Sequence, residues 1–139
     1  MQLLLFSILV VSYCEATLGI GRLQSIAVRG RLTCNGVPAS NVKIKLYEKE
    51  NIIDVLMDEV RTDSNGMFLA SGSKTELTNI DPKVNVYHRC NYVGICYRKF
   101  GITIPDSFIS LGAIPKKVYD IGEINLANKF TGETTDCIN

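Results

Sequence analysis

Hydrophobic and polar positions alternate along residues 26–48 and predict two amphipathic strands joined by a turn. Even positions are mainly apolar in 26–34 and again in 42–46, while arginine and lysine stand at odd positions between them. Because successive side chains of a strand point to opposite faces, each segment has one apolar face and one polar face. Asn35-Gly36 breaks the pattern between the two runs, as expected for a turn.

The rest of the chain contains five further short runs with the same alternation. The seven predicted strands cover residues 25–33, 42–49, 56–62, 67–71, 84–90, 96–104 and 118–126. Asp63-Ser64-Asn65-Gly66 predicts a hairpin turn, because its Asp and Asn side chains bond nearby backbone N–H groups and glycine tolerates a positive φ. A change of phase at Gly122-Glu123 predicts a bulge in the last strand. Seven short strands without a long helix predict an all-β, seven-stranded antiparallel β-sandwich.

The first residues have the pattern of a secretory signal peptide. Residues 3–11 read LLLFSILVV, and the compact residues Cys14 and Ala16 precede a cleavage site after Ala16, although cleavage a few residues later stays open. The apolar run is shorter than the ~20 residues that span a bilayer, and no other segment predicts a transmembrane anchor. We therefore expect a secreted, extracellular protein with a signal peptide at residues 1–16 and one domain at 17–139.

Composition narrows the possible classes of function. Without residues 1–16 the chain keeps 15 basic and 13 acidic residues, a net charge of +2. This nearly neutral balance gives no support for nucleic-acid binding, which usually shows a basic footprint.

Four cysteines remain in the mature chain and indicate two disulfides. If successive strands alternate in direction, Cys34, Cys90, Cys96 and Cys137 all lie at one end of the sandwich. Cys90 and Cys96 flank a single hairpin, so we predict the pairs Cys90–Cys96 and Cys34–Cys137. The crossed pairings stay open, because sequence alone does not determine connectivity.

Four stretches of the chain resemble the nematode transthyretin-like family. They read VRGRLTCNGVPASNVKIKLYE, LMDEVRTDSNGMF, TELTNIDPKVNVYHRC and KKVYDIGEINL, stand in the order found in the family, and extend over nearly all of the mature chain. The four cysteine positions also match the family's set. The resemblance implies secretion and a disulfide-stapled sandwich of transthyretin-like, or more broadly immunoglobulin-like, architecture.

The resemblance implies less about function. One family member is described as an extracellular bridge between phosphatidylserine on dying cells and an engulfment receptor. Transthyretin carries thyroid hormone in a channel between subunits, and a related branch hydrolyses 5-hydroxyisourate. We expect a secreted, non-enzymatic binding or adaptor module that recognises a cell-surface lipid such as phosphatidylserine, or a receptor. The alternative is a carrier of a small hydrophobic ligand in an oligomer channel, with the oligomeric state left open.

The residue inventory argues against catalysis and against a bound metal or cofactor. The hydrolase branch uses two histidines, an arginine and a terminal Tyr-Arg-Gly-Ser, whereas this sequence has one histidine, His88, and closes with Asp-Cys-Ile-Asn. We therefore expect His88 to be a hydrogen-bonded structural histidine. The spacing Cys90-x5-Cys96 is not a zinc pattern, and an EF-hand would need glutamate where the chain has Gly72.

Two apolar loop segments are the candidates for partner contact. They contain Tyr92, Val93 and Ile95 in the first, and Phe108 and Ile109 in the second. The alternative for both is packing over the open end of the sandwich. The basic residues on the polar strand faces favour a solvated surface over a lipid-binding one, because acidic residues dilute their field.

Overall fold

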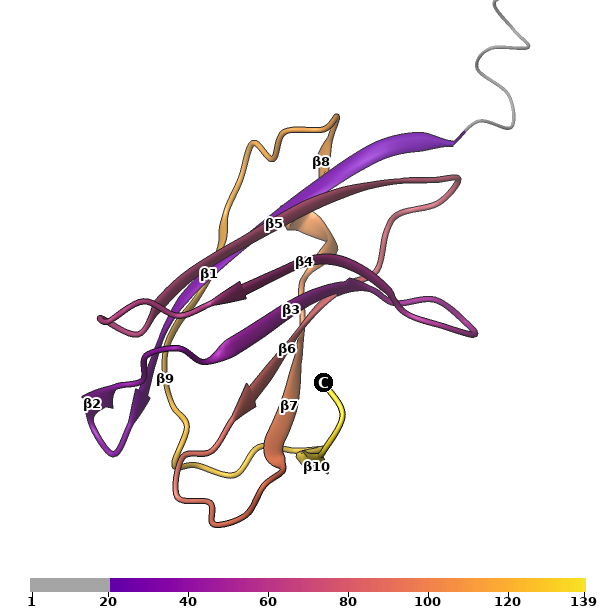
Figure 1. Ribbon diagram of the computed structural model, residues 1–139. Helices are drawn as coiled ribbons and strands as arrows, with labels where there is room; N and C mark the ends of the chain where they lie inside the picture. Colours follow the sequence, from indigo (N-terminus) through magenta and orange to yellow (C-terminus); the bar gives the residue numbers. More distant parts are fainter. Residues whose placement is uncertain (1–20) are drawn as a thin grey trace, which may run out of the picture.

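Ten strands form two sheets around a common core in the computed structural model, which describes residues 21–139 (Figure 1). The long strands are β1 (Arg22–Cys34), β3 (Lys43–Glu48), β4 (Val55–Arg61), β5 (Met67–Glu76), β6 (Pro82–His88), β7 (Tyr97–Thr103) and β9 (Tyr119–Asn125). The short elements are β2 (Val37–Pro38), β8 (Ser110–Leu111), β10 (Thr134–Asp136) and the 3-10 turn η1 (Asp106–Phe108). Each of the seven predicted strands overlaps one long strand, so the β-sandwich prediction is confirmed.

The first sheet is organised around β1, the longest strand. On one side β1 pairs antiparallel with β5, from Arg22 opposite Glu76 to Arg31 opposite Met67. On the other side it pairs antiparallel with β8 and parallel with β9. The parallel pair departs from the fully antiparallel prediction. In a series of strands that alternate in direction, the first and the seventh run the same way, so they pair in parallel when the chain brings them together.

The second sheet has the order β10-β7-β6-β3-β4 and is antiparallel throughout. β4 is one edge of this sheet, and the turn after it carries the chain across to β5 in the first sheet, so the predicted hairpin turn joins two strands that do not pair. β10, which the sequence analysis did not predict, covers the free edge of β7. The expected signal peptide at 1–16 lies outside the described residues. No helix among residues 21–139 has the length and apolar character required to cross a membrane.

The predicted alternation places one face of each strand in the core. The fully or almost fully buried apolar residues of the strands include Ile26, Val28, Leu32, Ile44, Leu46, Phe68, Val84, Val86 and Phe100. Burying each such side chain contributes about 1.5–3 kcal/mol to folding. Phe130, from the tail after β9, stacks on Phe100 with ring centroids 4.4 Å apart and closes the core on that side.

The turn at Gly66 and the bulge in β9 are both present, although only Asp63, and not Asn65, uses its side chain in the turn. At the β4–β5 turn, Oδ1 of Asp63 accepts the backbone N–H groups of Asn65 and Met67, each at 2.9 Å, and Gly66 has φ +77°. In β9 the register shifts between Arg29 and Arg31 of β1, which is the expected bulge. Gly30 lies at that shift, and a Cβ atom there would collide with the Ile121 side chain.

Candidate functional site

Two disulfides bring the four cysteines to one end of the sandwich, but the pairs differ from those predicted. Cys34 is bonded to Cys90, and Cys96 is bonded to Cys137. The predicted pairs Cys34–Cys137 and Cys90–Cys96 are therefore wrong. The reason is that β10 lies along β7 and delivers Cys137 to Cys96, while Cys90 is buried in the core beside the end of β1. We call this end of the molecule the cysteine pole.

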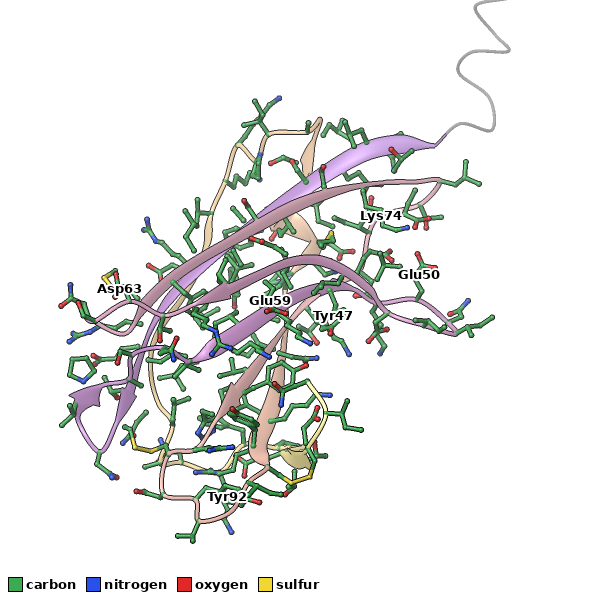
Figure 2. The ribbon with its side chains drawn as sticks, viewed as in Figure 1. Tyr47, Glu50, Glu59, Asp63, Lys74 and Tyr92 are labelled. Carbon is green, nitrogen blue, oxygen red and sulfur yellow. A yellow bond between two sulfur atoms is a disulfide. The ribbon has the colours of Figure 1, made fainter. Side chains whose placement is uncertain are left out.

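The loop between β6 and β7 projects from the cysteine pole with apolar side chains in solvent. Val93 is fully exposed and Ile95 is 89% exposed, whereas Tyr92 is half-buried. Figure 2 shows Tyr92 on this loop at the lower end of the view. Exposed aliphatic residues at a loop tip are a candidate contact surface. We call Val93 and Ile95 the apolar tip, and contact with a partner there stays a prediction.

The loop that carries the apolar tip is held by several bonds. Arg89 donates to the backbone carbonyl of Ile95 at 2.6 Å and to that of Cys96 at 3.2 Å. Its guanidinium also lies 4.4 Å from the ring centroid of Tyr97. Disulfides anchor the residues on both sides of the loop. A loop ordered before binding loses less conformational entropy when a partner arrives.

A pair of asparagines connects this loop to the β1–β2 turn. The side-chain amides of Asn35 and Asn91 donate to each other at 2.8 and 3.1 Å. Both residues have a positive φ, 55° and 52°, which asparagine tolerates better than most residues do. The turn carries a further exposed apolar residue, Val37, so exposed aliphatic side chains at this pole come from more than one segment.

The second predicted contact segment is placed elsewhere. Phe108 and Ile109 follow β7 at its other end, about 20 Å from the apolar tip for a seven-residue strand. Both are half-buried and pack against the core, and the Phe108 ring meets Tyr119 edge-on with centroids 4.7 Å apart. The structure therefore gives these two residues the packing role that the sequence analysis left as the alternative.

His88 is buried beneath the cysteine pole. Its Nδ1 accepts the backbone N–H of Cys90 at 3.1 Å, and its ring meets Phe100 edge-on. Burial, and then the positive charge of Arg98, lower its pKa to about 4. His88 is therefore a neutral, hydrogen-bonded residue of the core at physiological pH, as the sequence analysis expected.

Arg98 organises the polar interior next to His88. Its guanidinium donates to the backbone carbonyls of Cys90, Leu126 and Asn128 and forms a two-pronged ion pair with Glu133, at distances of 2.7–3.1 Å. One buried side chain thus connects β7 to the loop after β6 and to the tail after β9. The sequence analysis missed this residue, because alternation alone does not predict a buried arginine.

A cluster of carboxylates lies at the end of the sandwich opposite the cysteine pole. One carboxylate oxygen each of Glu48, Glu50 and Glu76 lies within 4.8 Å of the others. Nζ of Lys74 contacts Glu50 at 3.1 Å and Glu76 at 3.0 Å. Figure 2 shows Lys74 and Glu50 near each other at the right of the view. The sequence held one signal for this site, since Glu48 has the inward parity of Leu46.

Charges around Glu48 are unfavourable for its ionised form. Burial raises its pKa to about 7, and a side-chain hydrogen bond with Glu50 and the negative charges of Glu76 and Glu50 act in the same direction. The pKa of Glu50, by contrast, is lowered, first by its bond to Lys74. The two neighbouring carboxyl groups therefore differ in protonation near neutral pH.

An open groove lies along β4 and β5 and has a volume of about 510 Å³. It is lined by Arg29, Val60, Arg61, Asp63, Met67, Phe68, Leu69 and Val118. Two arginines at an apolar floor would suit an amphipathic ligand with a negative group. The sequence analysis did not predict this groove.

Known proteins resemble this chain over most of its length. A family model described as "TTR-52: Transthyretin-like family" matches residues 29–105, from β1 to the end of β7. Transthyretin-like protein 5 of Caenorhabditis elegans is 49% identical over 122 residues, which cover 86% of this chain and 88% of that protein. Transthyretin-like protein 2 of the same organism is 44% identical over 128 residues, with 86% of each chain covered.

A structural likeness outside this group is weak. The crystal structure of a 9R-lipoxygenase from Cyanothece aligns with a TM-score of 0.42 and 14% identity, covering 74% of this chain and 16% of that one. A similarity of this size carries no argument about fold or function.

Proposed function

The chain belongs to the transthyretin-like family, and on this premise we propose that it is a secreted, non-enzymatic binding module that contacts cell surfaces through its apolar tip. The observation that carries the proposal is the loop from β6 to β7, which holds Val93 and Ile95 in solvent from a disulfide-anchored frame. Two disulfides suit an oxidising, extracellular compartment. The signal-peptide pattern of residues 1–16 supports the same compartment.

The partner that suits the tip best is an anionic lipid surface, with phosphatidylserine as the lipid to test. Aliphatic side chains at a tip can enter the boundary between headgroups and acyl chains, where their burial is favourable. The exposed Arg89 lies beside the tip, and a basic residue near an anionic membrane surface contributes about 1 kcal/mol. The small number of anchors predicts weak, reversible binding. A receptor on the cell surface is the other outcome that the test must separate.

Sedimentation with lipid vesicles tests this proposal. We expect the mature protein to sediment with vesicles containing phosphatidylserine and less with vesicles of neutral lipid. The double substitution Val93→Ser with Ile95→Ser should abolish the difference, because it removes the aliphatic anchors. Ile114→Ser is the matched control, since Ile114 is also exposed but lies on the connection between β8 and β9.

The outcomes divide the alternatives. Equal sedimentation with anionic and neutral vesicles refutes the lipid partner. In that case, binding of the labelled protein to intact cells decides whether a receptor is involved. If the double variant stains cells as strongly as the wild type, the apolar tip is not the contact surface. Wild-type sedimentation of the double variant with anionic vesicles would likewise exclude the tip.

The groove along β4 and β5 favours a second candidate, the carrier of a small hydrophobic ligand. Its 510 Å³ and its floor of Met67 and Leu69 fit a ligand of that kind. Light scattering after size exclusion tests the version with a channel between subunits, because a strict monomer has no such channel. Displacement of an apolar fluorescent dye, compared with Leu69→Asp, tests the groove in a monomer.

A further inference from the structure

We propose that Glu48, Glu50 and Glu76 form a binding site for a divalent cation, and that calcium is the ion that fits it best. The site lies at the end of β3 and β5, opposite the cysteine pole, and is independent of the function proposed for the apolar tip. Two of its three carboxylates stand at the ends of strands, so the backbone fixes their positions. Glu50 stands in the β3–β4 connection and can adjust to an ion.

The spacing of the oxygens is compatible with one bound calcium ion. Oxygens bound to one ion can be separated by at most twice the metal–oxygen distance, which is about 4.6–5.2 Å for calcium and about 4.0–4.2 Å for magnesium. The three carboxylate oxygens lie within 4.8 Å of one another. They are therefore close enough together for one calcium ion, and magnesium, which gives up its water ligands reluctantly, should bind less well to a site made of protein carboxylates. Ligands that are all oxygen exclude a preference for soft metals.

A second observation points to a ligand at this place. Glu48 is only 4% exposed, and its Oε2 atom is buried without a hydrogen-bond partner among the described residues. A buried carboxylate oxygen that lacks a donor is destabilised when it carries negative charge. It needs a proton or a cation. A cation held among the three carboxylates would supply the positive partner that this buried oxygen lacks.

Lys74 does not fill this role for Glu48. Its ammonium forms ion pairs with Glu50 and Glu76. One ammonium among three carboxylates leaves a net negative charge whenever Glu48 is ionised, which attracts a cation. The same ammonium competes with an incoming ion for two of the three ligands. We therefore expect weak binding, in the range of roughly 0.1–1 mM that is typical of extracellular calcium modules.

Calorimetric titration of the mature protein with calcium chloride at about pH 8 tests the site directly. The titration should reach a calcium concentration roughly ten times the weakest expected dissociation constant. We expect saturable binding of calcium, weaker binding of magnesium and no effect of sodium at equal ionic strength. Glu48→Gln should weaken calcium binding at least tenfold, and Lys74→Gln should tighten it. Glu59→Gln is the control, because Glu59 is an acidic residue of β4 that pairs with Lys45 outside the cluster.

A proton shared among the carboxylates is the alternative to a bound cation, and the pH dependence of calcium affinity distinguishes the two. If a cation binds Glu48, calcium affinity should fall at least tenfold from about pH 8 to pH 5.5, because the proton and the ion compete for the same oxygen. Amide resonances of residues 48–50 and Glu76 should shift with calcium at constant pH. No heat and no shift with calcium, or equal affinity in Glu48→Gln, would overturn the proposal and leave a shared proton as the only occupant.

Discussion

Cys34, the last residue of β1, is bonded to Cys90, just beyond β6, so one covalent link joins the two sheets at the cysteine pole. The second disulfide, Cys96–Cys137, instead joins β7 to the tail strand beside it in the same sheet. The two bonds therefore have different structural roles. The first holds the sandwich closed, and the second holds the tail.

Removing the inter-sheet disulfide should strongly destabilise the protein. Cys34→Ser with Cys90→Ser opens a loop with a sequence separation of 56 residues, for which chain entropy gives about 4 kcal/mol. Denaturation by urea measures the loss. The pair Cys96→Ser with Cys137→Ser opens a similar loop but frees only the tail, so we expect the smaller effect there. A non-reduced digest with a peptide joining Cys90 to Cys96 would contradict the assignment.

Replacing Arg98 should cost more than replacing its neighbour. Arg98→Met leaves the carbonyls of Cys90 and Leu126 without their donor and isolates the carboxylate of Glu133, which together should lower the free energy of unfolding by roughly 3–5 kcal/mol. Lys99→Met is the matched control, because its ion pair with Asp136 at 3.6 Å is partly exposed and should contribute less than about 1 kcal/mol. Equal losses in chemical denaturation would show that Arg98 is not a buried anchor.

The β4–β5 turn requires glycine for two separate reasons. Gly66 has φ +77°, and a Cβ atom there would also collide with the carbonyl oxygen of Leu32. Gly36 has φ +84° but open space around it. Gly36→Ala should therefore cost only the left-handed backbone, about 1–2 kcal/mol, and Gly66→Ala should cost more. Thermal unfolding of the two variants measures the difference in stability that the collision causes. A similar loss of stability in both variants would show that the collision does not occur.

Two buried groups should make opposite contributions to the pH dependence of stability. The pKa of Glu48 rises from 4.5 to about 7 on folding, so the folded state binds the proton more tightly, and this contribution is lost as the pH rises through 7. The pKa of His88 falls from 6.5 to about 4, so its contribution is lost as the pH falls below 6.5. Each slope is at most about 1.4 kcal/mol per pH unit, and between pH 4.5 and 6.5 the two oppose each other.

Glu48→Gln separates these contributions. The variant keeps the shape of the protonated side chain but cannot titrate. Of the two groups, only His88 should then contribute to the pH dependence of stability. We expect its free energy of unfolding to rise more steeply than that of the wild type between pH 4.5 and 6.5, and to exceed it above pH 7. Urea denaturation across this range measures the difference. Parallel curves for the two proteins would show that Glu48 does not titrate with a raised pKa.

Local patterns accounted for much of the architecture. The alternation around Ile44 and Leu46 predicted β3 and its buried face. The turn that begins at Asp63 was predicted from its residue types, and the Asp63 side chain bonds to nearby backbone N–H groups there. The tail was different. β10 has three residues, too few for a periodic pattern, and it forms because β7 offers a free edge. The predicted disulfide pairs were wrong because this strand, which brings Cys137 to Cys96, was not predicted.

The candidate sites show the same division. The sequence left both apolar segments with the same two interpretations, and only the structure shows that Val93 and Ile95 are exposed whereas Phe108 and Ile109 pack against the core. The inward parity of Glu48 could be read along its strand. Its neighbours Glu50 and Glu76 could not be assembled from sequence, since Glu76 comes from the far end of β5.

The sequence by itself determined the seven long strands, the β4–β5 turn, the β9 bulge and the gathering of cysteines at one pole, because period-two alternation and turn chemistry act between residues close in the chain. The tertiary structure alone decided which cysteines pair, that β9 lies parallel to β1, and that the carboxylates of Glu48, Glu50 and Glu76 lie together. These depend on which strand edges meet, and that choice is made by packing the whole core.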